Sequence, residues 1–191
     1  MITLEEPHMG LNDSRTPNEV QMWNTWNVTQ TETVQHMLDW VAEVARGAPG
    51  GKLKNLVFRC HGAPAYLHCG AGIRRTDTPR FSAWRGLIEK IWFSACQVGY
   101  ITPHNGRGCA PGPAQGDGNM FCSEIAQAAQ CHVVASTELQ VIGLDRTLPY
   151  GKLDTFEGLV LSYNPAGQVS WRHRYPSTYE VETGRWVRNP D

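Results

Sequence analysis

Three short apolar runs, each of the length of a β-strand, constrain the fold of this sequence more than any other feature. They read LKNLVFRC at 53–60, IWFSAC at 91–96 and CHVVAS at 131–136. Strands that are apolar at consecutive positions are buried on both faces, which is typical of a parallel sheet in an α/β protein. The segments between these runs must then supply the crossover connections that parallel strands need.

Helical patterns in the remaining segments fit this interpretation. In 33–46 apolar residues recur three and four positions apart, and Thr29 or Thr31 is a candidate cap at the start. Residues 81–90 carry apolar side chains on one helical face, and 119–130 is rich in small helix-forming residues. The sequence therefore predicts an α/β fold with a mostly parallel sheet flanked by helices.

The two ends of the chain differ from this middle part. Residues 1–30 are polar, and we expect an irregular lead-in that packs onto the domain. Residues 158–163 and 168–174 flank a turn-forming Asn-Pro-Ala-Gly, which predicts an antiparallel hairpin at an edge or over one end of the sheet. The 191 residues suit a single domain, with 156–191 as its C-terminal hairpin and tail.

Composition excludes several classes of partner. The net charge is −1 and the pI is about 6.6, so the chain has no bulk attraction to nucleic acid or to an anionic membrane. No apolar stretch approaches the ~18 residues that span a bilayer, and the N-terminus lacks the pattern of a secretory signal. The six cysteines form no CxxC pair. We therefore expect reduced thiols and a cytoplasmic protein, although export of an effector without a signal remains compatible with the sequence.

Two reactive side chains stand at the ends of two apolar runs. His61 directly follows the run at 53–60, and Cys96 closes the run at 91–96. If these strands are parallel and adjacent, imidazole and thiol meet at one edge of the sheet, where the imidazole can take the thiol proton. Gly62 has no Cβ, so its N–H can approach a reacting carbonyl oxygen, helped by the N–H of Cys96.

Each residue alone also has a structural interpretation. A cysteine that closes a buried strand is most often an inert small hydrophobic residue. A histidine after a strand is more often a surface residue than a base. The pair is more informative, because His61 and Cys96 occupy matched strand ends, one followed by glycine and the other preceded by alanine.

The pairs His61-Gly62 and Ala95-Cys96, with the spacer between them, resemble the signature of the caspase-like cysteine peptidases of clan CD. That superfamily includes caspases, metacaspases, legumain and the CHAT domains, and the small bacterial caspase-like and CHAT-type domains are the nearest in pattern. The resemblance covers roughly residues 53–137. It implies a caspase-like fold and a protein or peptide substrate, with Cys96 as nucleophile, His61 as general base and Gly62 as oxyanion donor. The small size and compact loops favour a bacterial or phage-like source over an animal caspase, and the resemblance implies a role in a toxin, effector or defence system.

The residues around Cys96 depart from the caspase motif Gln-Ala-Cys-Arg-Gly, because they read Ser-Ala-Cys-Gln-Val. The basic pocket with which caspases select aspartate is therefore not implied. The candidate substrate-binding residues flank the Ala-Cys pair or follow it as acidic residues: Ser94, Gln97, Asp117 and Glu138, with Asp145 as a further acidic candidate. For each acidic residue, a solvated loop charge is the simpler interpretation.

Other sites fit less well. The glycine-rich loop at 105–119 lacks the GxxxxGK[ST] pattern of a phosphate loop, and we interpret it either as a substrate or activation loop or as a plain connector. Adjacent Cys–His pairs point to opposite faces of a strand, so we expect no metal and no cofactor. The alternatives to a peptidase are a non-catalytic protein-binding domain on this scaffold and a thiol-dependent acyltransferase or deamidase.

Overall fold

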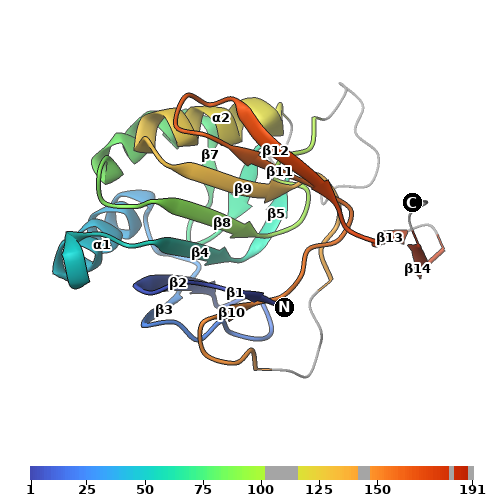
Figure 1. The fold of residues 1–191 in the computed structure, drawn as a ribbon, viewed down its shortest axis with the longest axis horizontal. Coiled ribbons are helices and arrows are strands. Elements are labelled where there is room, and N and C mark those ends of the chain that lie inside the picture. The colour runs from blue at the N-terminus through green and yellow to red at the C-terminus, as the bar shows by residue number, and fades with distance from the viewer. Residues whose placement is uncertain (102–115, 142–146, 181–182, 189–191) are drawn as a thin grey trace.

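The computed structural model describes residues 1–101, 116–141, 147–180 and 183–188. Its central strands are β2 (His8–Asp13), β3 (Asn24–Val28), β4 (Asn55–Arg59), β8 (Lys90–Ser94), β9 (His132–Ser136), β11 (Leu159–Tyr163) and β12 (Val169–Arg174). They form one seven-stranded sheet in the order β12-β11-β9-β8-β4-β2-β3 (Figure 1). The strands from β3 to β9 are parallel, whereas β11 and β12 are antiparallel. The prediction of an α/β fold with a mostly parallel sheet is confirmed.

The helical segments are α1 (Val34–Gly47), α2 (Gly118–Ala129) and the 3₁₀ helices η1 (Pro49–Gly51) and η2 (Arg75–Trp84). Both predicted α-helices are present, but the cap of α1 is Thr33, whose hydroxyl accepts a hydrogen bond from the N–H of His36 at 3.1 Å. The helix predicted at 81–90 is wrong in extent. The 3₁₀ helix contains Pro79 and ends at Trp84, and Gly86, with φ +75°, turns the chain toward β8.

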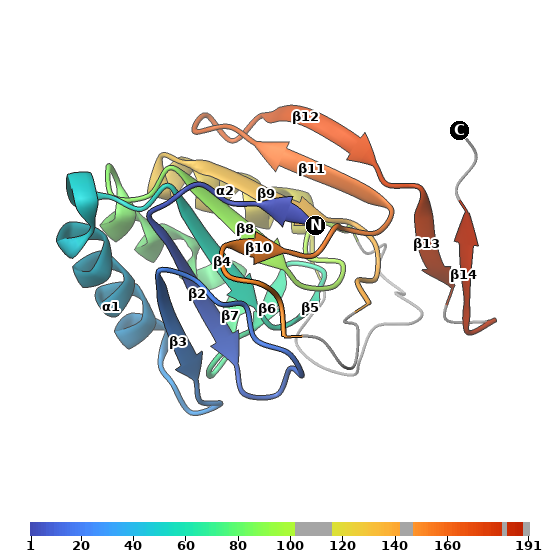
Figure 2. The ribbon, with the colours of Figure 1, turned by 60° about the horizontal axis from the view of Figure 1, so that its bottom comes forward.

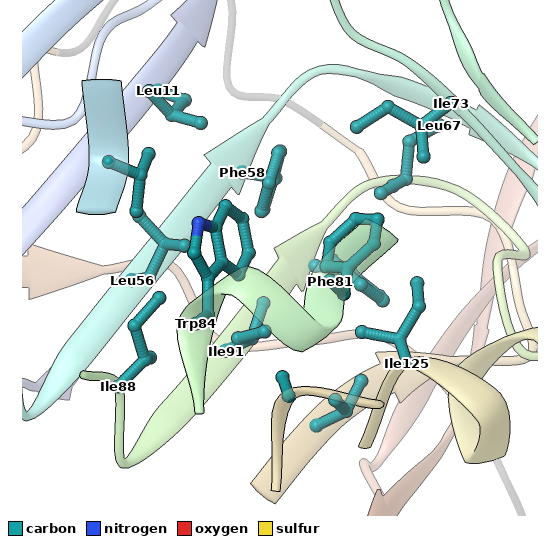
Figure 3. Close-up of a cluster of buried hydrophobic side chains, with 14 of the residues drawn as sticks. Leu11, Leu56, Phe58, Leu67, Ile73, Phe81, Trp84, Ile88, Ile91 and Ile125 are labelled. Atoms are coloured by element: carbon teal, nitrogen blue, oxygen red, sulfur yellow. The ribbon is translucent and has the colours of Figure 1, made fainter. Parts of the chain in front are cut away.

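Helices cover one face of the sheet. Side chains of α1, α2 and η2 pack against the apolar residues of β4 and β8 in one large core. Figure 3 shows the indole of Trp84 between the helical layer and Phe58 of β4. The Trp84 N–H donates to the carbonyl oxygen of Leu38 at 2.9 Å, so this buried ring is anchored to α1 by a hydrogen bond as well as by packing.

The opposite face has a different cover. Here β1 (Ile2–Thr3) pairs with β10 (Lys152–Leu153), and Figure 2 shows this ribbon in front of the sheet with α2 behind it. Leu148 and Phe156, on either side of β10, pack with Val57 and Trp92 of the sheet. Within the described residues, no helix lies in this second core. The sheet is therefore flanked by helices on one face, and not on both as a doubly covered sheet would be.

The N-terminal prediction is wrong, because residues 1–30 supply two parallel strands of the central sheet. Three of the six residues of β2, HMGLND, are polar, yet all six are buried. The following loop satisfies its polar groups: the Asn12 amide exchanges hydrogen bonds with the backbone of Val20, and His8 Nδ1 accepts from the N–H of Trp23. This strand brings its last residue, Asp13, to the edge where β4 also ends.

Smaller elements gather at that edge and at the C-terminus. A three-stranded antiparallel sheet follows β4 directly, formed by β5 (His61–Ala63), β6 (Tyr66–His68) and β7 (Ile73–Arg74). The hairpin predicted for 158–174 is confirmed as β11–β12, at the edge of the main sheet. The tail adds a second hairpin, β13 (Ser177–Glu180) with β14 (Arg185–Arg188), which stands apart from the main sheet in Figures 1 and 2.

Candidate active site

The two reactive residues predicted from the sequence lie at the same edge of the sheet. Strands β4 and β8 are parallel neighbours with Arg59 opposite Ser94, so the two residues after each strand emerge side by side. His61 and Cys96 both line one pocket of about 420 Å³ at this edge. A thiol and an imidazole therefore face a common cavity.

The segments that follow the two strands are closely packed at Gly62. A Cβ at this position would lie 2.6 Å from the carbonyl oxygen of Cys96 and 2.9 Å from the Cβ of Ala95. No side chain fits in that space, so a glycine is required for the backbone after His61 to pack against Ala95 and Cys96. The His-Gly and Ala-Cys pairs noted in the sequence are thus in direct contact.

One nitrogen of the His61 ring has a hydrogen-bond partner among the described residues. The Nε2 atom lies 3.2 Å from the carbonyl oxygen of Arg15, and a carbonyl can only accept, so Nε2 carries the proton. In the neutral ring this leaves the lone pair on Nδ1. Nδ1 is therefore the atom that is able to take a proton from the thiol.

The Arg15 carbonyl is held in place by a buried carboxylate. The Asp13 side chain is fully buried and accepts hydrogen bonds from Nε and Nη2 of Arg15, both at 2.6 Å, and from the N–H of Gly70 at 2.9 Å. Burial by itself would raise the pKa of Asp13, but these hydrogen bonds and the charge of Arg15 hold it below its ordinary value. The guanidinium also contacts the ring and the carbonyl of His68. This cluster fixes the segment that orients His61.

Cys96 is half-buried and sits in a tight turn. Its Sγ atom contacts the backbone N–H and carbonyl oxygen of Gln140, each at 3.4 Å. The next residue, Gln97, has φ +53°, a left-handed conformation that costs a non-glycine residue about 1–2 kcal/mol. The N–H of Gln97 donates to the carbonyl oxygen of Glu138 at 2.9 Å, so the segment after β9 stabilises the turn.

The other predicted site residues are placed differently. Ser94 lines the pocket, and its hydroxyl accepts from Nη1 of Arg59 at 2.7 Å. Asp117 caps α2 by accepting from the N–H of Met120, and the carboxylate of Glu138 lies 4.0 Å from Arg174. The described residues that line the pocket do not include Gln97, Asp117 or Glu138. Asp145 and residues 105–115 of the glycine-rich loop lie outside the described residues.

Sequence reasoning missed several residues of the pocket, namely Pro17, Arg59, Gln140, Val141 and Tyr179. Of these, only Arg59 could have been noticed from the sequence, because it is the only charged residue of β4 and a buried charge needs a specific reason. The others come from segments far apart in the chain that only the fold brings together.

The other described cysteines differ from Cys96 in burial. Cys60, Cys69, Cys122 and Cys131 are buried, and no described cysteine is in a disulfide. Burial raises the pKa of the Cys131 thiol to about 12 and raises that of Cys122 further. Because the thiolate is the nucleophile, these two thiols are poorly reactive in the folded protein.

The described part of the chain contains no helix long and apolar enough to cross a bilayer. It also contains no cluster of three or more His, Cys, Asp or Glu side chains arranged to hold a metal ion. Comparisons of the chain with models of protein families, with curated proteins and with solved structures found no match.

Proposed function

We propose that this chain is a cysteine endopeptidase that hydrolyses peptide bonds with Cys96 as nucleophile and His61 as general base. One observation carries the proposal: the imidazole and the thiol line the same pocket, and Gly62 packs its backbone directly against Cys96. The resemblance to caspase-like peptidases supports the same roles, since each catalytic residue of that family follows an apolar strand. With it we propose a caspase-like fold and a protein or peptide substrate.

The reaction follows from the tautomer of His61. Nδ1 takes the proton of the Cys96 thiol, and the thiolate attacks the carbonyl carbon of the scissile bond. The proposed donor to the resulting oxyanion is the N–H of Gly62. Collapse of the tetrahedral intermediate breaks the C–N bond, and the imidazolium gives its proton to the departing amine. Water, activated by His61, then hydrolyses the thioester and restores the thiol.

The exposed ring of His61 and the half-buried sulfur of Cys96 are compatible with access by a peptide. The Arg15 carbonyl supports the proposed mechanism, because it keeps Nε2 protonated and holds the ring in one orientation. None of the described cysteines is in a disulfide, which is compatible with action in a reducing compartment such as the cytoplasm.

The test is labelling by peptides that carry an electrophilic ketone in place of the scissile bond. Mass spectrometry of the labelled protein should locate the adduct on Cys96, and Cys96→Ala should abolish it. Cys109→Ala is the matched control and should keep the label. His61→Gln should lower the labelling rate by about 10²-fold or more, as loss of a general base does.

Two results would contradict the proposal. One is a wild-type protein whose Cys96 reacts with iodoacetamide but with none of the peptide electrophiles, which indicates a non-catalytic binding domain. The other is turnover of a peptide library without gain of water across a cleaved bond. Acyl transfer joins the acyl group to another amine, and deamidation changes a side chain, so product masses separate both from proteolysis.

A further inference from the structure

Arg59 is the most unusual residue of the pocket. It ends β4, and only 3% of its surface is exposed. Its Nη1 donates to the hydroxyl of Ser94, but within the described residues Nε and Nη2 have no hydrogen-bond partner. Nη2 forms a long ion pair with Oδ2 of Asp154, at 3.5 Å and without the geometry of a hydrogen bond. A buried charge with two unsatisfied donors is costly, and such groups are normally paired.

The guanidinium belongs to the same pocket as the proposed nucleophile. Arg59 and Ser94 are its buried polar residues, and Pro17, Ala95 and Val141 contribute apolar walls. Cys96 lines this pocket too. When its thiolate attacks a peptide carbonyl, the side chain of the residue that carries this carbonyl lies next to the pocket and can enter it. That residue would meet N–H donors at the buried end.

The neighbouring acidic residues leave a positive site in place. Asp154 and Glu157 are the carboxylates that act on Arg59, and neither lines the pocket. Asp154 is partly exposed, so water screens its charge. Burial raises the pKa of Glu157 to about 7, so this carboxyl is close to half protonated at neutral pH. Asp154 therefore offsets the charge of Arg59 only in part, and Nε has no hydrogen-bond acceptor within the described residues.

Only one class of side chain satisfies this arrangement. Two N–H groups of one guanidinium form a planar fork that matches the two oxygens of a carboxylate. A lysine or arginine side chain would meet a like charge, and an aliphatic one would leave both donors unpaired. A side-chain amide supplies one oxygen and no charge.

Resting on the proposed function, we propose that Arg59 determines specificity, binding the carboxylate of an aspartate or glutamate immediately before the scissile bond. Arg59 is outside the His-Gly and Ala-Cys signature. Its role follows from its burial, from the two donors that lack a hydrogen-bond partner among the described residues, and from its place in the pocket of Cys96.

The experiment compares peptide electrophiles that differ only in this residue: Asp, Glu, Asn, Leu or Arg. The measured quantity is the second-order rate of Cys96 labelling for each probe. We expect the Asp or Glu probe to react at least about 100-fold faster than the Leu and Arg probes, since a site built to hydrogen-bond one group rejects analogues that lack it. Asn should fall between them.

Two substitutions of Arg59, with one control at another arginine, test whether Arg59 causes the preference. Arg59→Met should remove it, so that the Asp and Leu probes react within about threefold of each other. Arg85→Met, which changes an exposed arginine away from the pocket, is the matched control and should keep it. Because loss of a buried cation can unfold a domain, Arg59→Lys serves as second variant. It keeps the charge but loses the fork, and should reduce the ratio of Asp to Asn rates.

The outcomes separate the two proposals. Fastest labelling by the Leu or Arg probe, or an acidic preference that survives both Arg59→Met and Arg59→Lys, overturns the assignment of Arg59 while the peptidase stands. If no probe labels Cys96 although iodoacetamide does, the proposed function fails, and the specificity assignment fails with it.

Discussion

Substitution of Gly62 by alanine tests whether the two strand ends are packed as described. The added Cβ would lie 2.6 Å from the Cys96 carbonyl oxygen, whereas a carbon and a carbonyl oxygen normally approach to 3.3–3.6 Å. The two segments must then separate by about 0.7–1 Å. Overpacking of this kind costs about 1–3 kcal/mol of stability. A displacement of about 1 Å between reacting groups can also cost about 10²-fold in rate.

Two assays on Gly62→Ala measure these effects, namely urea denaturation and the rate at which a peptide electrophile labels Cys96. The matched control is Gly99→Ala, in the same turn region, where a Cβ would meet its nearest neighbour at an ordinary 3.5 Å. We expect the control to stay within about 0.5 kcal/mol of the wild type and to label normally. Equal stability and equal labelling of both variants would refute the close packing of Gly62 on Cys96.

Three further predictions concern buried groups. Asp13→Asn weakens the anchor of Arg15 and should cost about 2–4 kcal/mol in urea denaturation, with slower labelling of Cys96; unchanged stability would contradict this role. The pKa of Glu157 is raised to about 7 in the folded state, so the ionised form is disfavoured there. Stability should therefore fall, relative to Glu157→Gln, by roughly 1–2 kcal/mol as pH rises from about 4.5 to about 7, after allowance for solvent screening. A pH-independent difference between the two proteins would count against it. Iodoacetamide should leave Cys122 and Cys131 unmodified until the protein is unfolded in urea, as peptide mass mapping would show.

The parts of the fold that the sequence predicts are those whose pattern is local. Continuous apolar runs correctly predicted β4, β8 and β9, and helical periodicity correctly predicted α1 and α2. The positions of His61 and Cys96 follow from the same runs, because parallel neighbouring strands end at a common edge. The glycine at position 62 was also informative, since it marks a close backbone approach.

The parts that were missed depend on tertiary contacts. Strand β2 has polar residues at half of its positions, and the loop after it supplies hydrogen bonds that allow His8 and Asn12 to be buried. The sequence cannot predict that the Arg15 carbonyl contacts His61 or that the Gln140 backbone contacts Cys96. Both contacts are made by backbone atoms, which every residue type has. The cover of the second face by β1 and β10 likewise follows from pairing between residues about 150 positions apart.

The dependence of Cys96 reactivity on His61 is decisive for the proposed function, and a small reagent measures it without any assumption about the substrate. Iodoacetamide alkylation of Cys96 near pH 6.5 should be at least about tenfold slower in His61→Gln than in the wild type, because the imidazole no longer promotes thiolate formation. His36→Gln, which changes an exposed ring on α1, should react like the wild type. Equal alkylation rates in all three proteins would show that the imidazole does not act on the thiol.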